Sequence, residues 1–221
     1  MSSSRQSCLI VLSSAIEGVS AESFIHAFTL THTAFNVQLL SPAGRPVEFV
    51  QQDDNSRRWL SDFRSKSFSA TISFESVDAN RYSALLIPCA PGAMNDLAHN
   101  TELGKIISHF VQERKPVCAV GLGVAALASA NQDDGSWYFA DYSMTGSSVF
   151  EMARLADFGN MSLIPEDFIK DQGAKYTSSE PDAVHIVVDR HLVTGQNEQS
   201  TVIAVQNMIL LCNQRQAKMS K

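Results

Sequence analysis

The sequence contains only four cysteines, and no two of them are spaced as a Cys-x-x-Cys pair. Cys8 and Cys118 lie in apolar runs that predict interior strands, and Cys212 lies in an apolar helical pattern. This usage is typical of free thiols in a reducing compartment and argues against a disulfide framework. The apolar run at residues 8–15 is too short for a signal peptide or a membrane span. No other run approaches ~18 apolar residues, so we expect a cytoplasmic protein without membrane insertion.

Positive charge is also scarce, because 17 Lys and Arg stand against 23 Asp and Glu and give a net charge of −6 at pH 7. Binding to nucleic acid needs basic residues that neutralise phosphates, so this balance disfavours direct contact with RNA. A local basic group at residues 57–66 is interpreted as the solvated face of a helix. The six histidines match no compact set of metal ligands, so we expect neither a metal nor another cofactor.

Short apolar runs alternate with longer amphipathic patterns along the chain. Buried strands are predicted at residues 8–13, 36–42, 84–88, 116–120 and 183–189. Helices are predicted at 20–32 with Ser20 as N-cap, 54–66, 93–114 with a break near Asn100, 123–130, 147–156, 165–171, and after Ser200 as N-cap. Apolar strands between helices imply a parallel sheet covered on both faces, which right-handed crossovers turn into a doubly wound α/β sandwich. No segment looks like a linker or a repeat, so residues 1–221 are expected to form a single domain with flexible ends at 1–7 and 215–221.

The same pattern indicates where a ligand would bind, because ligands of doubly wound sheets bind beyond the carboxyl ends of the strands. The strand at 116–120 runs into Gly121-Leu122-Gly123, which has the glycines of a nucleophile elbow. A cysteine in such a turn gains thiolate character from the helix that follows, and a histidine beside it can deprotonate it. Neither is present, because Gly121 has no side chain and Leu122 cannot accept a proton.

Four segments carry a resemblance to a known family. They are YSALLIPCAPGAMNDLA at 82–98, KPVCAVGLGVAALASA at 115–130, LIPEDFIKDQGAKY at 163–176 and RHLVTGQNEQS at 190–200. In this order they resemble the class I glutamine amidotransferase-like superfamily, in the branch that holds the PfpI-type proteases, the Parkinson-disease protein and the bacterial heat-shock deglycases. The resemblance spans nearly the whole chain. It implies a flavodoxin-like three-layer sandwich, with a mainly parallel sheet and helices on both faces.

The family pattern also implies where the catalytic groups would lie. Its elbow usually reads Lys-Pro-Val-x-x-x-Cys-His-Gly, so the family cysteine falls on Gly121 and the family histidine on Leu122. Its oxyanion-side loop usually reads Pro-Gly-Gly-His-Gly, and here Pro91 in that loop has no N–H to donate. The family acid falls on Glu22, with Glu17 as the second choice. We therefore expect a degenerate site without catalytic residues. The other candidate pocket residues are Cys89, Ala90, Gly92, Gly123, Thr145, Gln196 and Asn197.

Two alternatives keep a function in the pocket. In the first, Cys89 or Cys118 is the nucleophile of a thiol-dependent deglycase, glyoxalase or amidase. We favour a core position for Cys118, which precedes the turn by three residues, and a structural or oxidisable thiol at Cys89, which has no evident base. In the second, the protein is a small-molecule sensor that has lost turnover. Gln196 and Asn197 are interpreted as residues that hold their own loop in place.

The leading interpretation is an assembly or adaptor subunit that has lost catalysis. Sheets of this kind often associate through exposed helices, so a homo-oligomer, either a dimer or a tetramer, is expected. The resemblance further implies membership of a five-part complex on early endosomes. That complex binds an activated Rab GTPase and carries mRNA and ribosomes, which would bring RNA to this chain only indirectly.

Overall fold

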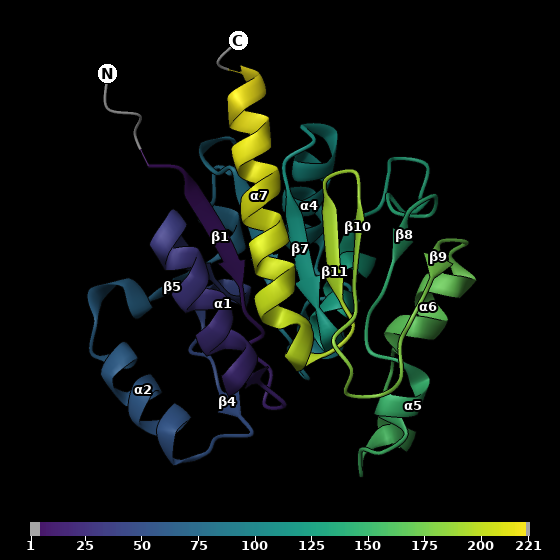
Figure 1. Ribbon diagram of the computed structural model, residues 1–221, viewed down its shortest axis with the longest axis horizontal. Helices are drawn as coiled ribbons and strands as arrows, with labels where there is room; N and C mark the ends of the chain where they lie inside the picture. Colours follow the sequence, from purple (N-terminus) through teal and green to yellow (C-terminus); the bar gives the residue numbers. More distant parts are fainter. Residues whose placement is uncertain (1–4, 220–221) are drawn as a thin grey trace.

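The computed structural model, which describes residues 5–219, has a central seven-stranded sheet between two layers of helices (Figure 1). Its strands are β1 (Ser7–Val11), β3 (Asn36–Leu40), β5 (Thr71–Ile72), β6 (Ala84–Ile87), β7 (Val117–Val120), β10 (Ile186–Asp189) and β11 (Leu192–Gly195). They lie in the order β10-β11-β7-β6-β1-β3-β5, and every neighbouring pair except β10–β11 is parallel. Two small parallel pairs, β2 (Val19–Ser20) with β4 (Phe49–Val50) and β8 (Ser143–Met144) with β9 (Lys175–Tyr176), lie outside this sheet. The predicted sandwich with a mainly parallel sheet is confirmed.

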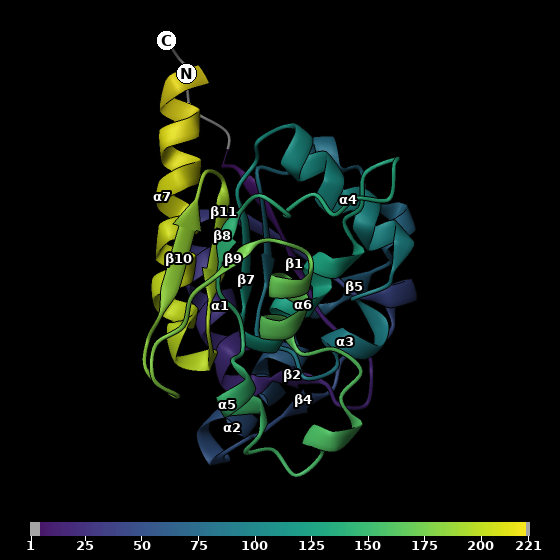
Figure 2. The same cartoon turned by 90° about the vertical axis from the view of Figure 1, so that its right-hand side faces the viewer.

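Helices cover both faces of the sheet, as Figure 2 shows with α7 on one side and α3 and α4 on the other. They are α1 (Ala21–Ala34), α2 (Asp54–Arg64), α3 (Ala93–Asp96), α4 (Thr101–Gln112), α5 (Val149–Met152), α6 (Pro165–Asp171) and α7 (Thr201–Met219). α1 packs beside α7, and the aromatic side chains of α1 and α2 form a cluster around Phe24. Among the described helices, none is long and apolar enough to cross a lipid bilayer.

Local side-chain chemistry accounts for where several helices begin. Ser20 caps α1 by accepting a hydrogen bond from the backbone N–H of Ser23, as predicted. Asn100 accepts from the N–H groups of Glu102 and Leu103, and this cap separates α3 from α4. The predicted break in the 93–114 pattern is therefore confirmed.

The segment after β7 differs from its prediction, because residues 121–129 form a run of 3-10 turns where an α-helix was expected at 123–130. Gly121 through Ala128 are buried. A Cβ atom at Gly123 would lie 2.2 Å from the carbonyl oxygen of Pro88, so this segment touches the backbone just after β6. Tertiary packing therefore sets its path, and helical periodicity does not report that packing. The helix expected at 147–156 is likewise shorter and covers only α5.

The C-terminal part also departs from expectation. The prediction ended the sheet at 183–189, but β11 follows β10 through a tight turn at Arg190, whose φ is 56°. Asn197 rather than Ser200 caps the last helical segment, which begins with a 3-10 turn at Glu198–Ser200. Of the ends that were predicted to be flexible, Ser7 pairs with Asn36 in the sheet and residues 215–219 continue α7. Residues 1–4 and 220–221 lie outside the described residues.

Candidate functional site

Two neighbouring strand exits meet at the position of the degenerate elbow. Gly121 follows β7 and has a φ of +57°, a left-handed conformation that favours glycine. Cys89 follows β6, which pairs with β7. A Cβ atom placed on Gly121 would lie 2.7 Å from Cys89 Sγ, closer than such atoms approach. The elbow-like glycine turn predicted at residues 121–123 therefore has its left-handed residue at Gly121, and the sulfur of Cys89 occupies the space that a side chain there would need.

The Cys89 thiol is held in its protonated form. It is 6% exposed, and burial raises its pKa to about 12, with the nearby Glu198 carboxylate adding to the rise. Backbone N–H groups of Leu122 and Gly123 donate toward the sulfur and oppose this rise in pKa. At pH 7 a pKa near 12 leaves about one thiolate in 10⁵ molecules. The group nearest to the elbow is therefore a poor nucleophile.

Cys89 opens onto a hollow of 160 Å³ at this edge of the sheet. Its lining residues are Gln51, Cys89, Pro91, Leu122, Ser147, Glu151, Met152, Leu155, Asp182, Asn197, Glu198 and Gln199. The described lining contains no histidine that could deprotonate the thiol. Cys118 is fully buried in β7 and lies away from this hollow, and burial raises its pKa as well. The predicted core position of Cys118 is confirmed.

The carboxylate beside the thiol comes from Glu198, which the sequence analysis did not select. Glu198 Oε2 accepts a hydrogen bond of 2.8 Å from Ser20 Oγ, while burial raises the pKa of this carboxyl. Glu22 is exposed and lines a different hollow, between α1 and α2. Glu17 is also exposed and faces an adjoining hollow of 470 Å³ that it shares with Leu122. Glu198 comes soon after the carboxyl end of β11. Because ligands of such sheets bind beyond the carboxyl ends of the strands, this position in the sequence could have identified Glu198 as a site residue.

The loop opposite the elbow offers few donors for an oxyanion. Pro91 has no N–H, as the sequence indicated, and the N–H of Cys89 donates to Ser23 Oγ at 2.9 Å. The N–H of Gly92 donates to the carbonyl oxygen of Gly18 at 3.0 Å. These hydrogen bonds hold the loop against the start of α1. Of the four backbone nitrogens at residues 89–92, those of Cys89 and Gly92 already donate and that of Pro91 carries no hydrogen. These three therefore cannot stabilise a developing negative charge.

The side-chain amides of Gln196 and Asn197 hydrogen-bond to neighbouring segments of the chain. This confirms the prediction that they hold their loop in place. Gln196 Oε1 accepts a hydrogen bond of 2.8 Å from the N–H of Ser179 and lies outside the lining of the hollow. Asn197 does line the hollow, but its polar atoms are all engaged. Its Nδ2 donates to Glu151 Oε1 at 2.9 Å and to the carbonyl oxygen of Ala183 at 2.8 Å, and its Oδ1 accepts from Ser200.

The remaining candidate pocket residues pack around the site without lining it. Ala90 and Thr145 are fully buried. A Cβ atom on Gly92 would lie 2.3 Å from Ser13 Oγ, so this glycine allows a close approach of two loops. Among the described residues, no group of three or more His, Cys, Asp or Glu side chains is arranged to hold a metal ion.

Comparison with known proteins identifies the family of this chain. Residues 24–208 match the model of the DJ-1/PfpI family. The chain belongs to the DJ-1/PfpI family. It is 54% identical over 211 residues to glutamine amidotransferase-like class 1 domain-containing protein 1 of Homo sapiens, with 96% of each chain covered. The protein of the same name from Danio rerio is 55% identical over 212 residues, covering 96% of this chain and 99% of its own.

A solved structure of another protein has a similar fold. Glyoxalase III from Candida albicans superposes with a TM-score of 0.81 at 23% identity, covering 94% of this chain and 97% of its own. At this level of identity the likeness shows that the two proteins share a fold. The elbow cysteine and histidine of the pattern quoted above are replaced by Gly121 and Leu122.

Proposed function

We propose that this member of the DJ-1/PfpI family is a non-catalytic adaptor subunit. In this proposal it works in the cytoplasm at early endosomes, in a complex that binds an activated Rab GTPase and links mRNA and ribosomes to the endosome. The observation that carries the loss of catalysis is the position of Cys89 Sγ, 2.7 Å from where a Cβ atom of residue 121 would lie. In this proposal the sulfur crowds the side-chain position at residue 121 and stays a neutral thiol.

The energetics of thiol catalysis support this proposal. Removing a nucleophile typically costs several powers of ten in rate, and the additional loss of its base adds little. Here the elbow has neither group, and the thiol that replaces the side chain has a pKa of about 12. A reaction of the family kind would therefore run near its background rate.

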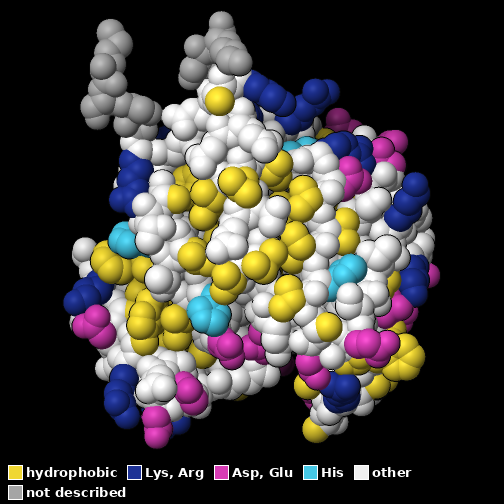
Figure 3. Space-filling model, viewed as in Figure 1, with side chains coloured by type: hydrophobic (Ala, Val, Ile, Leu, Met, Phe, Trp, Pro, Cys, Tyr) yellow, Lys and Arg dark blue, Asp and Glu magenta, His cyan; other side chains and the backbone are white. Residues whose placement is uncertain are grey.

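The outer face of α7 supports a role in assembly. Residues 201–214 contain no Asp, Glu, Lys or Arg, although Ile203 and Leu210 are 39% and 56% exposed. Val184 and Val188, in and beside β10, are exposed as well. Figure 3 shows apolar side chains gathered over this side of the molecule. We refer to Val184, Val188, Ile203 and Leu210 as the α7 face, and apolar patches of this kind mark interaction surfaces.

Turnover assays test the catalytic half of the proposal. Purified protein is incubated with methylglyoxal, with a glycated amine and with a simple amide, alongside the Cys89→Ala variant. We expect wild type and variant to give the same rate, indistinguishable from that of buffer. A rate of about 1 s⁻¹ or more, typical of enzymes, that disappears in Cys89→Ala would contradict the proposal and favour a thiol enzyme.

Affinity purification from cells tests the adaptor half. The tagged wild-type protein is expected to recover other protein subunits and, in the presence of GTP-loaded Rab, ribosomes and mRNA. Leu210→Lys is expected to recover less, because it places a charge on the α7 face, whereas Ile16→Lys, at an exposed loop position, should behave as wild type. Recovery of the tagged chain alone, in both wild type and control, would rule the adaptor role out.

A further inference from the structure

A second hollow lies at the carboxyl edge of the sheet, on the other side of β1 from the elbow. It measures 360 Å³ and is bounded by the ends of β1, β3 and β5, by the loop at 44–49 and by the C-terminal end of α2. Most of its wall is apolar and comes from Leu12, Leu39, Val47, Phe49 and Phe63. It shares no lining residue with the hollow at Cys89. A volume of this size lies within the range of small-molecule sites, about 300–1,000 Å³.

One charged side chain, Arg64, lines this apolar hollow. Its guanidinium carbon lies 5.8 Å from the ring centroid of Phe49, another wall residue, so the charge is held over the hollow. Two other cations on or just after α2 do pair with acids, Arg57 with Asp54 and Lys66 with Asp62. Within residues 5–219, no carboxylate forms an ion pair with Arg64.

The other polar groups in the wall are already engaged with the protein. Thr71 Oγ1 donates to the carbonyl oxygens of Gly44 and Arg45, at 3.1 and 3.2 Å. Ser69 Oγ donates to the carbonyl oxygens of Lys66 and Arg64. An incoming ligand therefore meets apolar walls and a single uncompensated positive charge.

We propose that this hollow binds a small carboxylic acid with an apolar tail, its carboxylate on Arg64 and its tail against Leu39, Val47 and Phe63. The planar guanidinium matches a carboxylate through two parallel hydrogen bonds, which an alcohol or an amine cannot reproduce. The hollow is too small for a docked helix, whose diameter is about 10–12 Å. The site stands apart from the adaptor proposal, and either one can fail without the other.

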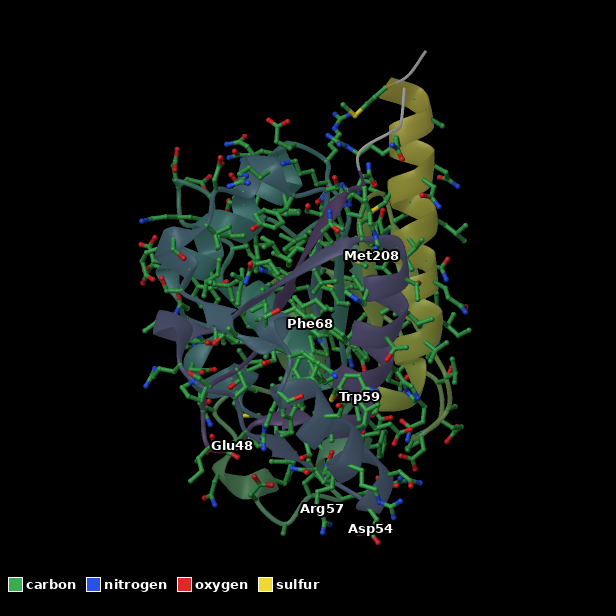
Figure 4. All side chains as sticks on the ribbon, turned by 90° about the vertical axis from the view of Figure 1, so that its left-hand side faces the viewer. Glu48, Asp54, Arg57, Trp59, Phe68 and Met208 are labelled. Atoms are coloured by element: carbon green, nitrogen blue, oxygen red, sulfur yellow. The ribbon has the colours of Figure 1, made fainter. Side chains whose placement is uncertain are left out.

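The chain offers a matched control for the charge. Figure 4 shows Arg57 and Asp54 together at one end of α2. Arg57 is thus on the same helix as Arg64, but it does not line the hollow. Both arginines are exposed, so neither substitution removes buried packing. Ala70 is also exposed and lines the hollow, and a phenylalanine at that position would fill it.

The experiment is a calorimetric titration of the full chain with decanoate, below its micelle concentration. We expect saturable one-to-one binding that is at least tenfold weaker in Arg64→Ala, as expected from the loss of one charged hydrogen-bonding partner. Arg57→Ala should bind as wild type, Ala70→Phe should bind not at all, and decanol and decylamine should bind wild type at least tenfold more weakly. Methyl NMR shifts of Leu39 and Val47 should follow the titration.

Other results would overturn the proposal in separable ways. If Arg64→Ala and Arg57→Ala weaken decanoate binding equally, the carboxylate does not contact Arg64. The same conclusion would follow if decanol bound as tightly as decanoate. Undiminished binding in a folded Ala70→Phe variant, or shifts confined to residues remote from Leu39 and Val47, would place the ligand elsewhere. Failure of decanoate and of the shorter octanoate to bind wild type at millimolar concentration would reject the site as a whole.

Discussion

At residue 121 the chain combines a left-handed backbone with a side-chain position that its neighbour Cys89 has filled. These two features reinforce each other. Glycine accepts the φ of +57° at little cost, and the absence of a Cβ atom leaves room for the sulfur. A larger residue at 121 would have to displace Cys89 and also adopt a conformation that L-residues rarely adopt.

This arrangement predicts a measurable coupling between the two positions. Gly121→Ala should lower the free energy of unfolding by about 1–3 kcal/mol, because it adds both backbone strain and a clash with Cys89 Sγ. In a Cys89→Ala background the clash is absent, so the same change should cost at least ~0.5 kcal/mol less. Urea denaturation of the four proteins measures the cycle. An identical cost in both backgrounds would mean that the sulfur does not occupy the space of the missing side chain.

A second residue, His191, predicts how stability depends on pH. It is 9% exposed in the turn just before β11, and burial lowers its pKa to about 4, with the charges of Arg190 and Arg114 adding to the effect. In the unfolded chain its pKa is about 6.5, so acid protonates the unfolded state first. The free energy of unfolding is therefore highest above about pH 6.5, where His191 is neutral in both states. It should fall by about 1–2 kcal/mol as the pH falls toward 4, after allowance for partial solvation.

Denaturation of His191→Gln over pH 4–8 checks this dependence. The variant is expected to show a shallower decline in unfolding free energy between pH 6.5 and 4 than wild type does. His99→Gln serves as the control, because His99 is exposed in the loop between α3 and α4. Parallel curves for wild type and His191→Gln would show that this imidazole is not the group responsible.

At the scale of single elements, the start of α7 depends on one amide. Asn197 caps the 3-10 turn at Glu198–Ser200 and also ties it to Glu151 and to the backbone at Ala183. This cap sets the direction of α7 and places Glu198 beside Cys89. The loop, the helix and the hollow are therefore joined through a single side chain.

Replacing this amide should be costly. Asn197→Ala should destabilise the fold by about 2–3 kcal/mol, because it removes the cap and leaves buried partners unpaired. Asn213→Ala, at an exposed position inside α7, should change stability by less than about 0.5 kcal/mol or raise it, since alanine favours helix. Thermal and urea unfolding provide the measurement. Similar small effects in both variants would contradict the role assigned to Asn197.

The elements also show how far sequence reasoning reached. Ser20 and the break at Asn100 were predictable, because capping is local chemistry between residues two or three positions apart. The turn at Gly121 was also predictable, because the glycines that permit it stand in the local sequence. By contrast, the 3-10 path of residues 121–129 follows from contacts with backbone distant in the sequence, which no periodicity encodes. Glu198 was missed although it follows a strand exit, since only the folded sheet shows that this exit and that of β6 open onto the same hollow.

At the scale of the whole molecule, the α7 face predicts self-association. A helix with no charge between residues 201 and 214 leaves Ile203 and Leu210 in contact with water unless another surface covers them. The antiparallel edge strand β10 adjoins this surface. A symmetric dimer would cover the same patch on two copies at once.

Light scattering after size-exclusion chromatography tests this at about 50 μM. Wild type is expected to run as a dimer or tetramer, and Ile203→Lys should shift it toward the monomer because each interface would bury two unpaired charges. Ile16→Lys, at a side chain that is 85% exposed, should leave the oligomer intact. A monomeric wild type, or an oligomer that survives Ile203→Lys unchanged, would exclude this face as the contact between copies.

The reactivity of Cys89 tests the central claim most directly. Native protein is treated with iodoacetamide from pH 7 to pH 11, and alkylation of Cys89 is followed by peptide mass spectrometry. With a pKa of about 12, the thiol should react roughly a thousandfold more slowly at pH 7 than it does in the unfolded chain, and its rate should still be rising at pH 11. A plateau in the rate below about pH 8 would instead reveal a stable thiolate beside the elbow, and the non-catalytic interpretation would be wrong.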